Sequence, residues 1–238
     1  MNFVFHHHLA LVDSGDPEVA LGAMLPDLLR VVDRSLRTSR RTVAAWPRDP
    51  DGLERVVLGV EHHFEVDAWF HDTDVFTRGE ALARARLAET GWARAGLFAH
   101  VVWELCLDGA LLARSPGTAA ESPRAEPTQT LGKTADLSPL ATRLLEARFP
   151  HVPRAVRSAQ AARLERLLSR VVELAAGYSE ARGLYARLEG MRHGLGLPPT
   201  DAPTMERVVL ALDELLTLAR PDVEELQATW RGRGSRDG

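Results

Sequence analysis

Three polar residues recur at four-residue intervals in EHHFEVDAWFHD, residues 61–72. They are His63, Asp67 and His71. An α-helix has 3.6 residues per turn, so each step of four rotates the side chain by only about 40°, and all three can share one face. Burial of an unpaired charge is costly, so a face of this kind needs partners elsewhere in the chain. The pattern predicts a helix that meets other helices around a polar site.

A second segment, HVVWELCLD at residues 100–108, repeats the spacing with His100, Glu104 and Asp108 among apolar residues. Helical bundles build metal sites from inward-facing histidines and carboxylates in this way. Mixed nitrogen and oxygen ligands suit Mn, Fe, Zn or Ni, whereas oxygen-richer sets suit Mg. Two alternatives remain open at this point. The polar stripe of the second segment can be an ordinary solvated face, and His63 with Asp67 can be an exposed i,i+4 pair.

Two more polar clusters lie nearer the N-terminus: His6, His7 and His8, and Asp27 in GAMLPD. We expect His7 to be exposed, while His6 or His8 could be a core histidine bonded to the backbone. Asp27 could cap a helix beside Pro26 or serve as a ligand. Seven of the nine histidines fall within the first 110 residues. This concentration favours a metal-type site in the N-terminal half.

The composition predicts an all-α protein. Leu, Ala and Arg dominate, Ile and Tyr are scarce, and no convincing alternating strand pattern is present. We expect a single helical domain over residues 1–238 with about 8–10 helices in an HD-like bundle. Its parts are site-bearing helices in 1–114, a mobile Pro-, Ser- and Thr-rich loop at 115–138, C-terminal helices in 139–230 and a disordered tail at 231–238.

Several functional classes are disfavoured. The net charge is −4 without a basic stripe, so we expect no nucleic-acid partner. No apolar run reaches about 18 residues and no signal peptide is recognisable, so we expect no membrane association. The single cysteine, Cys106, favours the cytoplasm and is interpreted as a buried small hydrophobe. No nucleophile elbow and no glycine-rich phosphate loop are found.

In this order the clusters resemble the acyl carrier protein phosphodiesterase family. The resemblance rests on the segments MNFVFHHHLA, GAMLPD, GVEHHFEVD and HVVWEL. A segment near the C-terminus, LEGMRHGLG, is also similar. The resemblance implies an HD-type helical metallohydrolase that releases 4′-phosphopantetheine from acyl carrier protein with a divalent metal. The ligands that it implies are His6, His8, Asp27, His63 and Asp67.

The sequence departs from the family pattern around this core. Phe64 replaces an arginine, and His71 replaces an aspartate unless a shift by one residue makes Asp72 its equivalent. His100 and Glu104 replace two aspartates of the later helix, and Leu105 replaces its histidine. These exchanges make the site less negative and softer, which favours Mn, Fe or Zn over Mg. We expect His71, His100 and Glu104 to act as catalytic residues, with a histidine moving protons near neutral pH.

The combined prediction is a metal-dependent phosphodiesterase or phosphohydrolase. Two alternatives remain open: a non-enzymatic binding protein with a decayed site, and a metalloenzyme of different chemistry such as oxygen-using di-metal catalysis. Acyl carrier protein is the expected partner, and the oligomeric state is left open. An acidic partner of this kind would dock on the local cluster Arg30, Arg34, Arg37, Arg40 and Arg41.

Overall fold

A computed structural model of the chain describes residues 2–46, 52–113 and 127–234. Within these ranges every regular element is helical, so the all-α prediction is confirmed. The described ranges hold twelve α-helices, more than the 8–10 expected. Three of them are short: α3 (Arg40–Ala44), α7 (Pro127–Ala135) and α10 (Val171–Ala176).

The chain divides into two compact units, each assembled from separate stretches of sequence. Unit A consists of Phe3–Trp69 and Ala119–Leu174, and unit B consists of Met1–Asn2, Phe70–Thr118 and Ala175–Gly238. The expected site-bearing stretch 1–114 is therefore shared between both units. None of the helices in the described ranges combines the length and the hydropathy needed to cross a membrane.

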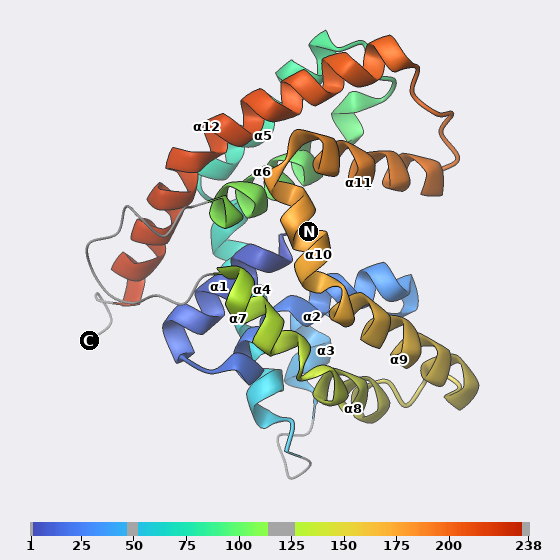
Figure 1. Ribbon diagram of the computed structural model, residues 1–238. Coiled ribbons are helices and arrows are strands. Elements are labelled where there is room, and N and C mark those ends of the chain that lie inside the picture. Colours follow the sequence, from blue (N-terminus) through green and yellow to red (C-terminus); the bar gives the residue numbers. More distant parts are fainter. Residues whose placement is uncertain (1, 47–51, 114–126, 235–238) are drawn as a thin grey trace. The chain divides into compact units, whose positions relative to one another are not determined.

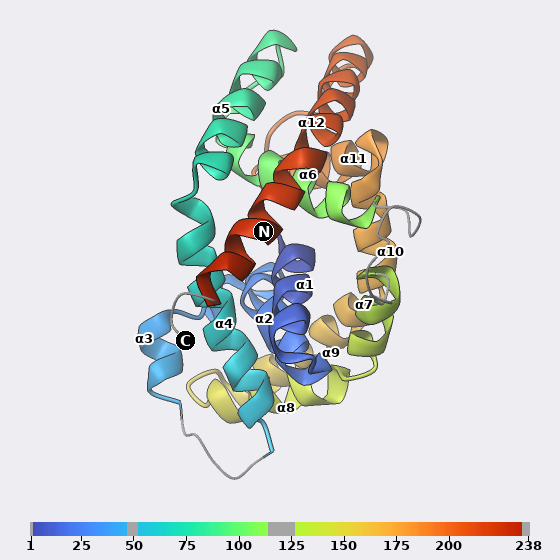
Figure 2. The same ribbon diagram turned by 90° about the vertical axis from the view of Figure 1, so that its left-hand side faces the viewer.

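Unit A is built on α1 (Phe3–Ser14), which packs against α2 (Pro17–Val32), and α7 contacts both (Figure 2). Asp16 starts α2 by accepting a hydrogen bond from the backbone N–H of Glu18, and Pro17 occupies the first turn, where its missing N–H costs nothing. The sequence of residues 18–33 predicts one or two short helices around Pro26, a residue type that suits a helix start. The structure instead has one continuous helix, α2, with Pro26 inside it.

The helix α4 (Glu54–His71) carries the polar face, and all of it up to Trp69 belongs to unit A. It approaches α2 backbone to backbone where Gly59 meets Gly22. A Cβ on Gly59 would overlap the carbonyl oxygen of Val19, so only glycine permits this approach. The remaining helices of unit A are α8 (Ser138–Arg148) and α9 (Arg154–Ser169), which pack on each other.

Two expected loops are partly helical. Residues 34–52 are rich in Arg, Pro and Asp, which predicts an exposed loop, but their described part contains a short 3-10 helix at Arg34–Leu36 and α3, which Ser39 caps. The predicted loop at 115–138 is wrong over its second half, because α7 forms there and its residues Leu131 and Thr134 are buried. Tertiary burial overrides the weak local signal at these positions. The first part of that loop lies outside the described residues.

Unit B is organised around α6 (Ala99–Leu112), whose side chains are almost all buried. It packs against α5 (Asp74–Glu89) and against the long helix α12 (Ala202–Gly234), which also contacts α5 and α11 (Ala181–Gly194) (Figure 1). Gly79 of α5 makes room for the fully buried indole of Trp103, since a Cβ there would overlap the ring. Gly91 and Gly96 predict a break between two helices in this region, and residues 90–98 separate α5 from α6 in the structure.

The buried side chain of Arg192 links two separate segments of unit B through hydrogen bonds. The guanidinium of Arg192 donates to the carbonyls of Ala93 (2.7 Å) and Pro198 (3.1 Å) and lies over the ring of Trp92. The segment 188–196 thus has a structural role. The helix that follows begins at Ala202 and extends to Gly234, so the expected tail is helical over 231–234, and 235–238 lie outside the described residues.

Candidate metal centres

The polar face of α4 meets α1 in unit A. His6, His63 and Asp67, here called the His63 triad, offer ligand atoms that all lie within 4.8 Å of one another. The imidazoles of His6 and His63 are buried, and their ring centroids are 4.0 Å apart. Asp67 is half-buried. The predicted i,i+4 pair of α4 therefore faces the interior of unit A and not solvent.

The orientation of His63 is fixed by the backbone of α2. Its Nδ1–H donates to the carbonyl oxygen of Ala23 at 2.9 Å, which leaves the Nε2 lone pair available to a metal. Burial lowers the pKa of His63 below its ordinary value, although the negative charges of Asp27 and Asp67 act in the opposite direction. The imidazole is therefore neutral at physiological pH, which is the form that binds metals.

Neither Asp27 nor His8 belongs to this triad, but Asp27 lies close enough to affect it. Asp27 is close enough for its charge to act on His63, and no described hydrogen-bond donor reaches its buried Oδ2. Its oxygens nevertheless do not join the 4.8 Å group. His8 lies two residues after His6 on α1, and side chains so spaced point to nearly opposite sides of a helix. Among the described residues, the group that contains His6 does not include His8.

The structure corrects the expectation for His7. Its side chain is 1% exposed, because α7 covers this side of α1, and its Nε2 shares a hydrogen bond with the Thr134 hydroxyl at 2.9 Å. Burial, together with the charge of His8, lowers the pKa of His7 to about 3. His62 points away from the triad and pairs with Asp13 on α1 at 2.9 Å.

Unit B contains a second group with the same type of ligands. His71, the last residue of α4, meets His100 and Glu104 of α6, and the ligand atoms of these three residues again lie within 4.8 Å. We call them the His100 triad. Glu104 Oε1 lies 3.4 Å from His71 Nε2 and 3.3 Å from His100 Nε2. The three residues expected to be catalytic are thus brought together.

A carboxylate and an arginine support the His100 triad. Glu80 Oε2 lies 3.3 Å from Nδ1 of His100, and Glu80 Oε1 accepts a hydrogen bond from Arg84 at 2.6 Å. Burial opposes ionisation of Glu80, but the hydrogen bonds from Arg84 and His100 outweigh it and lower its pKa. Burial and the neighbouring His71 lower the pKa of His100. Two touching imidazoles and a buried carboxylate remain as potential ligands.

Sequence spacing did not identify every residue around these centres. Glu80 was missed, because its i,i+4 spacing to Arg84 is also that of an ordinary surface pair. The carbonyl of Ala23 carries no sequence signal at all. Asp108, the third member of the second stripe, is fully buried but is not part of the triad, and Asp72 is exposed. Cys106 is buried as predicted, and burial raises the pKa of its thiol.

No family model matches this chain, and comparison with curated proteins and with solved structures finds no match. The family resemblance therefore remains a prediction.

Proposed function

We propose that this chain is a divalent-metal-dependent phosphodiesterase or phosphohydrolase whose metal is held by the His63 triad. One observation carries the proposal: His6, His63 and Asp67 come from two helices and converge within 4.8 Å, with His63 oriented from behind by the Ala23 carbonyl. A hydrogen bond that fixes the far nitrogen of a histidine is the usual outer support of a metal ligand.

The donor set fits a divalent ion of the Mn, Fe or Zn class. Two imidazoles and one carboxylate form a mixed nitrogen and oxygen site, and the burial that lowers the pKa of His63 keeps its lone pair unprotonated. Asp67 supplies negative charge. When bound, such an ion would polarise a phosphoryl oxygen and lower the pKa of a water molecule.

Asp27 is the residue best placed to handle a proton beside this site. Its charge reaches His63, and its buried Oδ2 has no donor among the described residues, so this oxygen can accept a hydrogen bond from a water molecule that enters the site. Asp27 would then position that water, while the two histidines and Asp67 hold the ion. This assignment gives Asp27 a role close to the ligands but separate from them.

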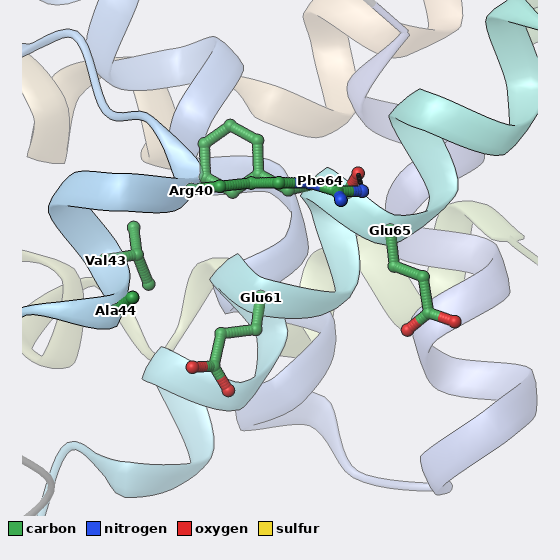
Figure 3. A pocket seen from close by; sticks show the side chains of 6 residues that line it. All are labelled: Arg40, Val43, Ala44, Glu61, Phe64 and Glu65. Atoms are coloured by element: carbon green, nitrogen blue, oxygen red, sulfur yellow. Dashed lines mark hydrogen bonds between the residues drawn. The ribbon is translucent and has the colours of Figure 1, made fainter.

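A phosphoryl substrate is negatively charged, and Arg40 of α3 offers a cation against α4, on the side of that helix that carries Glu61 and Glu65. Its guanidinium donates to the backbone carbonyl of Phe64 at 2.5 Å, directly after His63 in the chain. Arg40 lines an open groove of about 350 Å³. Figure 3 shows the side chains of α3 and α4 that line it. The resemblance places an arginine where this chain has Phe64, and Arg40 returns a guanidinium to that neighbourhood. Glu61 and Glu65 line the same groove, so the positive charge is local to Arg40.

The narrower proposal is release of 4′-phosphopantetheine from acyl carrier protein in the cytoplasm. It rests on the resemblance and on exposed arginines that could receive an acidic partner. A single buried cysteine suits a reducing compartment. The arginines that the sequence singled out are all exposed: Arg30, Arg34, Arg37, Arg40 and Arg41.

Metal analysis of the purified chain is the first test, followed by assays on a chromogenic phosphodiester and on holo acyl carrier protein. His63→Ala and Asp67→Asn should each lose one equivalent of metal and all hydrolysis. The matched control is His62→Ala, the neighbouring histidine that pairs with Asp13, which should retain both. A metal stoichiometry that is unchanged in both triad variants would refute the ligand assignment. Bound metal with no hydrolysis of either substrate would favour the binding-protein alternative.

A further inference from the structure

Two separations between ligand atoms of the His100 triad match those of a tetrahedral metal site. Four ligands at about 2.0–2.2 Å around a tetrahedral Zn²⁺ lie about 3.3–3.6 Å from one another. Glu104 Oε1 lies 3.4 Å from His71 Nε2 and 3.3 Å from His100 Nε2. Both carboxylate–imidazole separations thus match edges of a coordination tetrahedron, and the ligand atoms of all three residues lie within 4.8 Å of one another.

The rings of His71 and His100 are stacked. Their planes are nearly parallel, at 13°, and their centroids are 5.0 Å apart. Phe76 contacts both rings from α5, with centroid distances of 4.6 and 4.9 Å, and limits their rotation. The packing of the three rings keeps both imidazoles beside Glu104.

An outer layer of hydrogen bonds selects the tautomer that a metal needs. A carboxylate can only accept a hydrogen bond, so Glu80 binds the Nδ1–H of His100 and leaves the lone pair on Nε2, the atom that faces Glu104. Arg84 fixes Glu80 and also donates to the carbonyl of Gly96 at 3.0 Å. Carboxylate–histidine–metal chains of this form are a regular feature of zinc sites.

The negative charge of Glu104 also favours a bound cation. Glu104 is 3% exposed on α6, where its neighbours Trp103 and Leu105 are fully buried, so solvent would screen the attraction between its carboxylate and a bound cation only weakly. Each imidazole could supply only one positive charge to this carboxylate. A divalent ion satisfies all three groups at once.

We propose that His71, His100 and Glu104 bind a zinc-class divalent ion in unit B, at a site separate from the one that the proposed function uses. His100 is about half exposed, so the fourth coordination position opens to solvent. Glu80 is a positioning residue that acts through His100. The proposal does not depend on the hydrolase activity of the His63 triad.

The test is titration of the full-length, chelator-treated chain with Co²⁺, whose visible absorption reports tetrahedral coordination, followed by displacement with Zn²⁺. In a His63→Ala background, which lacks the first site, one equivalent of Co²⁺ should bind and give a tetrahedral spectrum. Addition of His100→Ala should abolish that spectrum. His100 is exposed enough for its truncation to leave the fold intact, and Glu104→Gln provides an isosteric second variant. Far-UV circular dichroism and thermal unfolding confirm that each variant is folded.

Glu80→Gln distinguishes a metal site from a packed cluster. It should weaken Co²⁺ binding by about 10- to 100-fold while one equivalent still binds at saturation. His193→Ala, at an exposed position of α11, is the matched control and should change nothing. A folded His63→Ala chain that binds no Co²⁺ would overturn the proposal, as would an unchanged spectrum in both His100→Ala and Glu104→Gln. Loss of hydrolysis alone bears only on the His63 triad.

Discussion

The crossing of α2 and α4 makes Gly59→Ala the sharpest test of how the His63 triad is positioned. A Cβ at position 59 would overlap the carbonyl oxygen of Val19, and it would lie 2.7 Å from Cα of Gly22 and 2.8 Å from the backbone N of Ala23. All three neighbours are backbone atoms, which cannot rotate away as side chains do. The two helices must therefore separate by about 1 Å to restore ordinary contact distances.

Overpacking of a close-packed interior costs about 1–3 kcal/mol and occasionally more. We place Gly59→Ala at about 3–4 kcal/mol, because the clash involves backbone on both helices. Alanine recovers about 1 kcal/mol through its better helix propensity. The expected net loss in the free energy of unfolding is about 2–3 kcal/mol. Separation should also lengthen the bond from His63 to the Ala23 carbonyl, so metal affinity should fall as well.

Urea unfolding of the metal-free protein measures the loss in the free energy of unfolding. A metal titration of the folded variant measures the fall in metal affinity. The control is Gly190→Ala in α11, where an added Cβ meets nothing within 4 Å. It should gain about 0.5–1 kcal/mol, because only the propensity term acts there. A Gly59→Ala protein as stable as the wild type, with unchanged metal affinity, would refute the backbone-contact reasoning.

Three further predictions concern single buried residues. His7 stays neutral when folded, with its pKa lowered from 6.5 to about 3, whereas the unfolded chain takes up a proton below pH 6.5. The wild type should therefore lose about 2 kcal/mol more than His7→Gln when the pH of urea unfolding falls from about 7.5 to 5, and Thr134→Val should keep that pH dependence. Gly79→Ala should cost at least about 2 kcal/mol and alter tryptophan fluorescence, because the methyl overlaps Trp103. Arg192→Lys should lower the free energy of unfolding by about 3 kcal/mol, since one ammonium cannot reproduce the guanidinium bonds to two carbonyls.

Helical spacing predicted which residues of one helix would share a site. His63 with Asp67, and His100 with Glu104, follow from the i,i+4 rule alone, because both members lie on one regular helix. The partners from other helices do not follow from spacing. The resemblance implied both His6 and His8 as metal ligands. Only the packing of α1 on α2 and α4 shows that His6 belongs to the His63 triad.

The sequence could not predict how the polar face would be divided. His63, Asp67 and His71 share one face of α4, which suggested one site, yet His71 groups with residues of α6 in unit B and the other two group with His6 in unit A. This division depends on which helices pack against each end of α4. Contacts between segments far apart in the chain leave no periodic trace in the sequence.

Charge should make the two triads select different metals. The His63 triad has Asp67 as a ligand and Asp27 within electrostatic reach, so two negative charges balance a divalent ion. In the His100 triad only Glu104 is available, because Glu80 is paired with Arg84, and a net positive charge remains. The more acidic site should tolerate the harder Mn²⁺, whereas the imidazole-dominated site should select Zn²⁺. The ratio of Zn²⁺ to Mn²⁺ affinity should therefore be at least about tenfold higher in His63→Ala than in His100→Ala, measured by competition on each chain. Equal ratios in the two variants would show that the second carboxylate does not govern metal choice.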